Sequence, residues 1–210
     1  MQNILDNGKL PGPVTLMFVA VWFGAMLWLG LAGVFPRPNG LPISNLQLAI
    51  VIPMVLFWTL FGLAPPFRRF VLGLDFLFLN LMQTWRMTGV AMLIMWGYGL
   101  LPGGFGLPMS ILDMSVGVLA VSVVIAIVRR SARWRIQAWL LNLWGFADFW
   151  ITITLAIVAF VPLAIDPVTE AGIRAVPMQP PLSIFPSFVI PFFSCLHFCA
   201  LAQLAQKHPD

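Results

Sequence analysis

The sequence predicts an all-α protein, a polytopic bundle of transmembrane helices with almost no part in water. The 210 residues are 60% hydrophobic and only 9% charged, whereas about a quarter of the residues in soluble globular proteins are charged. Apolar runs long enough to cross a hydrocarbon core recur along the chain, and proline or glycine separates them. The basic residues lie mainly in the short connections between these runs, where they orient membrane helices.

Six segments have about the 20 residues that a helix needs to cross about 30 Å of hydrocarbon. These predicted spans are residues 13–35, 45–65, 78–101, 109–128, 137–163 and 183–205. The connection at residues 66–77 is too short to cross by itself, so we interpret it as a partly interfacial lead-in to the third span. Because no separate soluble domain is indicated, residues 1–210 are predicted to form a single transmembrane domain.

The lysine and arginine distribution predicts the orientation, since positive residues accumulate on the cytoplasmic side of short loops. With both termini in the cytoplasm, the inner side holds eight basic residues: Lys9, Arg68, Arg69, Arg129, Arg130, Arg133, Arg135 and Lys207. The outer side holds Arg37 and Arg174. This asymmetry favours an even number of spans with both ends inside. It also accounts for the net charge of +4 without a nucleic-acid partner, which we do not expect.

Arg86 is the remaining basic residue, and it falls inside a predicted span. A charge near the bilayer centre costs about 2.5–3.5 kcal/mol on insertion scales and normally faces a partner or a water-filled cavity. On a helix, Asn80, Gln83 and Arg86 recur at three-residue spacing and share a face. Asp148 in the fifth span and His197 in the sixth lie at a similar depth. We therefore predict a polar cluster in which Asp148 neutralises Arg86, and Gln83 and His197 complete its hydrogen bonds.

Two interpretations of this polar cluster stay open. In the first, it only holds helices together, because structural ion pairs perturb ionisation as functional ones do. In the second, it lines a cavity for a proton, an ion or a small polar molecule. The second predicts a protein that binds or translocates a small solute. An enzyme is the least favoured class, since no nucleophile and base occur together at recognisable spacing.

The alternative function is an accessory subunit of a larger respiratory or photosynthetic membrane complex. Such a subunit would contact other membrane subunits, or further copies of itself, through its aromatic and methionine-rich outer faces. The lipid bilayer is a partner under either function.

Ser110 and Asp113 stand near the outer start of the fourth predicted span with the spacing of a capping box. In that motif the side chains satisfy free N–H groups at the beginning of a helix, where the helix dipole also favours a carboxylate. We therefore expect both residues to cap this helix.

No cofactor is predicted. Cys195, His197 and Cys199 are residue types that bind metals, and they lie close together in the sequence. However, a helix turns by about 100° per residue, so His197 points away from the two cysteines. We expect no metal there and interpret the cysteines as small packing residues. His208 lies at the C-terminal end, which excludes a haem with two histidine ligands inside the membrane. Ligation by His197 and a methionine stays open, although we do not expect haem.

Several short polar motifs together resemble a known group of proteins. They are Gln83-x-x-Arg86-x-x-Gly89, LPGGFGLP, Asp113-x-x-x-Gly117, Asn142-x-x-Gly145-x-x-Asp148 and Pro186 through His197. This pattern resembles uncharacterised multi-pass membrane proteins of bacteria over residues 78 to 205. It departs from them before the first aspartate, where bulkier residues from Pro108 onward replace a small-residue stretch. The resemblance implies a bacterial inner-membrane location and no known activity.

Overall fold

A computed structural model of the chain describes residues 5, 8–36, 44–101, 103–160 and 179–206. The regular elements of these residues are helices, and one isolated β-bridge pairs Lys9 with Leu74. Five helices are long and apolar enough to cross a membrane, which confirms the predicted all-α class and the apolar spans. Arg37 and Arg174, which the sequence analysis assigns to outer loops, and Lys207 and His208 near the C-terminus lie outside the described residues.

The five long helices match five of the six predicted spans. They are α2 (Pro13–Leu31), α3 (Asn45–Leu63), α7 (Gly103–Val128), α8 (Trp134–Phe160), and the π-helical segment η3 (Phe185–Val189) continued by α10 (Ile190–Leu204). Helix α7 begins before residue 109, where the sequence predicted its start, because the turn that precedes the helix lies earlier in the chain. Gly99 makes that turn with φ 72°, a left-handed conformation that glycine adopts readily.

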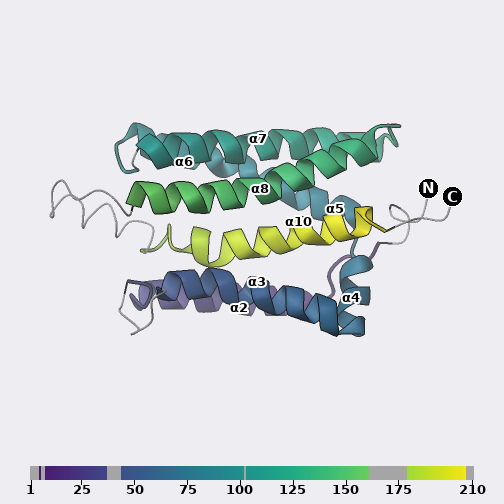
Figure 1. Ribbon diagram of the computed structural model, residues 1–210, viewed down its shortest axis with the longest axis horizontal. Coiled ribbons are helices and arrows are strands. Elements are labelled where there is room, and N and C mark those ends of the chain that lie inside the picture. Colours follow the sequence, from purple (N-terminus) through teal and green to yellow (C-terminus); the bar gives the residue numbers. More distant parts are fainter. Residues whose placement is uncertain (1–4, 6–7, 37–43, 102, 161–178, 207–210) are drawn as a thin grey trace. The chain divides into compact units, whose positions relative to one another are not determined.

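Most residues of the third predicted span form three consecutive helical pieces, and none of these alone is long enough to cross a membrane. They are α5 (Phe76–Leu81), the 3-10 segment η1 (Met82–Thr88) and α6 (Gly89–Gly97). At rises of about 1.5 Å per α-helical and 2.0 Å per 3-10 residue, the three pieces extend over about 36 Å. This exceeds the hydrocarbon thickness of about 30 Å. All three pack along α7 (Figure 1).

A short helix, α4 (Pro65–Leu72), precedes the third span. Its exposed face carries Arg68 and Arg69, while Val71 is buried. Asp75 caps the start of α5, since its Oδ1 atom accepts a hydrogen bond of 2.6 Å from the Phe78 amide. Helix α4 therefore has an exposed basic face and a buried apolar side, and the helix that follows it is capped. These features are typical of a segment that lies at the membrane interface before the chain enters the bilayer.

The chain forms two compact units, which are described separately. The first comprises Met1–Leu10, Phe70–Leu163 and Leu196–Asp210, and the second comprises Pro11–Arg69 and Ala164–Cys195. Aromatic contacts hold the second unit together: the Trp22 ring packs edge-on against Phe188 at 4.9 Å. The candidate site lies entirely in the first unit.

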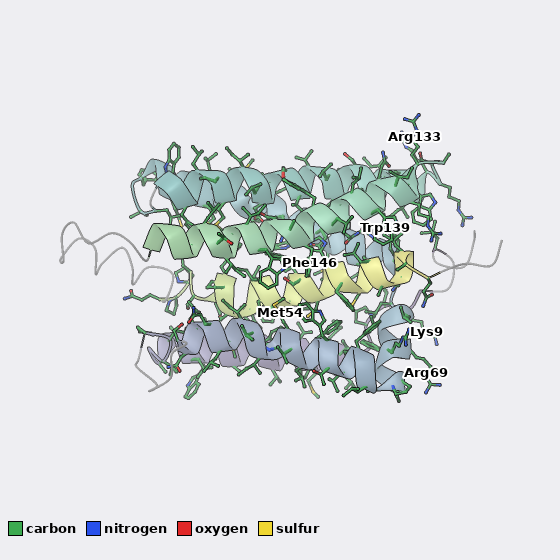
Figure 2. All side chains as sticks on the ribbon, viewed as in Figure 1. Lys9, Met54, Arg69, Arg133, Trp139 and Phe146 are labelled. Atoms are coloured by element: carbon green, nitrogen blue, oxygen red, sulfur yellow. The ribbon has the colours of Figure 1, made fainter. Side chains whose placement is uncertain are left out.

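Polar contacts close one end of the first unit. Gln203 on α10 donates from Nε2 to the carbonyl oxygens of Val71 at 3.1 Å and Leu74 at 3.0 Å. Figure 2 shows Lys9 and Arg133 at this same end of the unit. Positive charge therefore gathers at one end of these helices.

Close backbone contact between α7 and η1 depends on Gly117. A Cβ atom at this position would lie 2.7 Å from the Met87 amide nitrogen and 3.1 Å from the Arg86 carbonyl carbon. Small residues allow membrane helices to approach this closely, and dispersion contacts then replace the hydrophobic driving force that lipid does not supply.

Gly117→Ala should destabilise the protein by about 1–3 kcal/mol, because the added methyl group meets backbone atoms that cannot rotate away. The measurement is the free energy of unfolding in mixed micelles. Gly24→Ala is the matched control, since Gly24 lies within α2 and a Cβ there meets no atom within 4 Å. Equal effects of the two substitutions would contradict the close approach of α7 and η1.

Candidate functional site

Arg86 lies at the centre of the candidate site, with a fully buried side chain. Its Nη1 atom donates to Asp148 Oδ2 at 2.6 Å and lies 3.3 Å from Asp113 Oδ1. The guanidinium carbon stands 3.8 Å from the ring centroid of Phe149, in a cation–π contact. We call Arg86, Asp113 and Asp148 the charge cluster. Its members come from η1, α7 and α8, so side chains from three separate elements meet around Arg86 Nη1.

The geometry of η1 helps to turn the polar residues of the third span toward one side. A 3-10 helix has 3.0 residues per turn, so residues three apart lie above one another, whereas in an α-helix three residues shift the face by about 60°. Asn80, Gln83, Arg86 and Gly89 follow this spacing and are all buried. A 3-10 run of seven residues is unusually long, and such runs often mark a functional hinge.

Two further glycines bring the partner elements into contact around the cluster. A Cβ atom on Gly89 would lie 3.1 Å from Asp113 Oδ2, so α6 begins directly against this carboxylate. A Cβ atom on Gly145 would overlap the imidazole of His197. These glycines belong to the motifs singled out in the sequence, and their role is to admit side chains from neighbouring helices.

A second group of polar side chains, Asn80, Asn142 and His197, forms what we call the amide ladder. Asn142 donates from Nδ2 to Asn80 Oδ1 at 2.9 Å and to the Ala138 carbonyl at 2.8 Å. Asn80 in turn donates to the Phe76 carbonyl at 2.7 Å. His197 Nδ1 lies 2.9 Å from Asn142 Oδ1. The ladder therefore connects α5, α8 and α10 by hydrogen bonds between fully buried side chains.

The structure corrects the capping role expected for Ser110 and Asp113. Because α7 begins at Gly103, both residues lie inside the helix, where N–H groups already have intrahelical partners. The Ser110 hydroxyl donates instead to the Gly106 carbonyl at 2.6 Å, and Asp113 pairs with Arg86. Asp113 is thus a member of the charge cluster.

The structure also differs from the expectation that Gln83 and His197 complete the hydrogen bonds of Arg86. His197 bonds to Asn142 instead. Gln83 lies one 3-10 turn from Arg86, and within the described residues neither of its amide atoms has a hydrogen-bond partner. The same holds for Arg86 Nε and Nη2 and for His197 Nε2. Buried polar atoms without partners are rare in proteins, and they often mark functional positions.

The charge cluster is unbalanced, with two carboxylates around one guanidinium. In the part of the chain that the structure describes, both carboxylates form their ion pairs with Arg86. If both were ionised, the cluster would carry a net negative charge, and burying an uncompensated charge costs several kcal/mol. A proton on one carboxyl, or a small cation beside the pair, removes this cost.

Cys195 and Cys199 form no disulfide bond. Within the described residues, no three histidine, cysteine, aspartate or glutamate side chains lie close enough together to hold a metal ion.

Sequence reasoning did not assign a site role to Asn142, Phe149 or Thr152. Asn142 stands at the head of the Asn142-x-x-Gly145-x-x-Asp148 motif, and the three-residue spacing of buried positions could have indicated it. Thr152 follows Asp148 by one turn, and its hydroxyl lies 3.5 Å from Asp148 Oδ1. The cation–π contact of Phe149 has no sequence signal, because an apolar residue in an apolar helix does not stand out.

The chain belongs to the family defined by the domain of unknown function DUF8737, whose model matches residues 43–205. The match covers the whole charge cluster and the amide ladder. No curated protein and no solved structure matches the chain.

Arg86→Leu should destabilise the protein by about 3–5 kcal/mol, because it leaves two buried carboxylates without a counter-charge. Asp113→Leu should be close to neutral, since it leaves the balanced Arg86–Asp148 pair. The double variant Arg86→Leu/Asp148→Leu should regain only part of the loss, because Asp113 then remains unpaired. The triple variant with leucine at all three positions should regain most of it. These differences are measured as free energies of unfolding.

Equal costs for Arg86→Leu and Asp113→Leu would contradict the charge imbalance. A triple variant whose loss equals the sum of the three single losses would show that the three side chains do not interact.

Proposed function

We propose that this integral membrane protein binds a proton or a small cation at the charge cluster and translocates it, either alone or together with a small solute. The observation that carries the proposal is the placement of two carboxylates around a single guanidinium nitrogen. Asp148 Oδ2 and Asp113 Oδ1 lie 2.6 Å and 3.3 Å from the same Nη1 atom. A clamp between helices needs one carboxylate, and the second makes the cluster a site for one exchangeable positive charge.

The extent of the buried polar groups supports this proposal. Along α8, Asn142, Asp148 and Thr152 are all buried and extend over about 15 Å. That distance is half of a hydrocarbon core about 30 Å thick. Polar groups in a membrane segment are expensive, and those that face the interior of a bundle often mark ion pathways and proton relays.

The proposal includes six spans with both termini in the cytoplasm of a bacterial cell and the protein in its inner membrane. The summed length of α5, η1 and α6 supports a sixth crossing in addition to the five long helices. The gathering of basic residues at one end of the first unit (Figure 2) supports the orientation, since the cytoplasmic side of membrane helices is the basic one.

Reporter fusions test this topology. Fusions after residues 40, 104 and 172 should report the outer side, and fusions after residues 132 and 210 the cytoplasm, because the basic connection between α7 and α8 stays inside. An outer location for residue 132 would overturn the orientation.

Ion movement is tested with purified protein in liposomes that contain a pH-sensitive dye and, in a parallel set, a dye sensitive to small cations. An imposed membrane potential should drive proton or cation entry above the rate of empty liposomes. Asp113→Asn and Asp148→Asn should each lower this rate at least tenfold, because each removes a carboxylate that holds the transported charge. Asp75→Asn is the matched control: it removes the same charge, and asparagine still caps α5.

Wild-type rates equal to those of empty liposomes, or equal losses in all three variants, would contradict the proposal. If the protein moves no ion and co-purifies stably with a respiratory or photosynthetic assembly, the accessory-subunit function replaces it.

A further inference from the structure

The amide ladder determines which nitrogen of His197 carries a hydrogen. The Asn142 carboxamide nitrogen donates to two acceptors, Asn80 Oδ1 and the Ala138 carbonyl, so both of its hydrogens are used. Asn142 Oδ1 can only accept a hydrogen bond. His197 Nδ1 lies 2.9 Å from this oxygen and must therefore be the protonated nitrogen. In the neutral imidazole, the Nε2 atom is then an acceptor with a free lone pair.

His197 Nε2 packs against Gly145, which lies on α8 between Asn142 of the amide ladder and Asp148 of the charge cluster. The imidazole is fully buried, and its Cε1 and Nε2 atoms are packed against the Gly145 backbone. Gly145 is three residues from both Asn142 and Asp148 on α8, about 4.5 Å along the axis from each. Within the described residues, Nε2 has no hydrogen-bond partner.

Phe149 contacts both groups. Its ring centroid lies 3.8 Å from the Arg86 guanidinium carbon and 6.1 Å from the His197 ring centroid. Phe149 thus links the imidazole to Arg86 on η1, whose ion-pair partners are Asp113 on α7 and Asp148 on α8. Gln83, which is buried and has no partner in the described chain, lies on η1 between Asn80 and Arg86. Nε2 is therefore an acceptor and the Gln83 amide can both donate and accept, and neither has a described hydrogen-bond partner.

We propose that His197 exchanges a proton with the charge cluster through Nε2, and that Asn142 is the positioning residue which keeps this nitrogen free to accept. The inference rests on the proposed function and extends the site from the charge cluster to the ladder. In the step, an aspartic acid O–H bond of the cluster breaks and its proton bonds to the Nε2 lone pair. Because Nε2 has no hydrogen-bond partner among the described residues, the carboxyl group must first move to hydrogen-bond distance from it. The carboxyl group becomes a carboxylate and the imidazole becomes an imidazolium. The Nδ1–H bond to Asn142 is unchanged, and the reverse step returns the proton.

The test uses the two histidines of the chain. His208→Gln removes the other histidine and leaves His197 as the single histidine. Nitrogen-15 NMR of histidine-labelled protein in lipid then reports the tautomer of one residue. The inference predicts a hydrogen on Nδ1 and none on Nε2 in the neutral form, with a second hydrogen appearing on Nε2 on acidification. A neutral form with hydrogen on Nε2 would overturn it, as would an imidazole that stays neutral throughout the pH range of ion movement.

Variants in the same background test the path. Asn142→Leu should abolish the preference for Nδ1–H, and His197→Gln should lower proton entry into liposomes at least tenfold while the thermal unfolding transition stays cooperative. Proton entry that survives His197→Gln would overturn the histidine step and leave the proposed function standing. A wild-type protein that moves no ion would overturn the proposed function, while the predicted tautomer and its protonation would still support the histidine assignment.

Discussion

The burial of one arginine is the constraint on which the first unit depends. A guanidinium in a bilayer must be paired and hydrogen-bonded within the protein. The chain meets this demand by bringing carboxylates from α7 and α8 to the same Nη1 atom. Such short contacts require three backbones to approach closely, which accounts for Gly117 against η1 and Gly89 against Asp113. The 3-10 geometry of η1 follows from the same demand, because it helps to turn a three-residue repeat of buried groups toward these partners.

The same arrangement distinguishes a structural clamp from a site of exchange. One carboxylate would neutralise the arginine, and replacing such a pair with apolar residues is often neutral or stabilising. A second carboxylate adds a charge that the protein must compensate with a proton or a cation. The amide ladder lies beside this cluster with its orientation fixed at Asn142, and His197 and Gln83 hold polar atoms that no described residue satisfies.

The sequence was sufficient to predict the helical class, the apolar spans and the meeting of opposite charges at a common depth. It was insufficient where the local helix type decided the outcome. Periodicity alone does not distinguish an α-helix from a 3-10 segment, so the third span was expected to be one helix. The spacing of Ser110 and Asp113 fits a capping box, but α7 begins at Gly103, because Gly99 makes the preceding turn. Because the helix starts earlier than predicted, Asp113 lies inside α7 and belongs to the charge cluster instead of capping the helix. The partners of Asn142 were also hidden, since a buried amide has no preference in sequence for one neighbour.

The most direct test of the account is a solid-state NMR measurement of the distances between arginine guanidinium nitrogens and aspartate carboxyl carbons, made on labelled protein in lipid bilayers. The account predicts that the Arg86 guanidinium lies within ion-pair distance of two carboxyl carbons. One contact should disappear in Asp113→Asn and the other in Asp148→Asn. A guanidinium with a single carboxyl neighbour, or with none, would contradict the claim that two aspartates share this arginine.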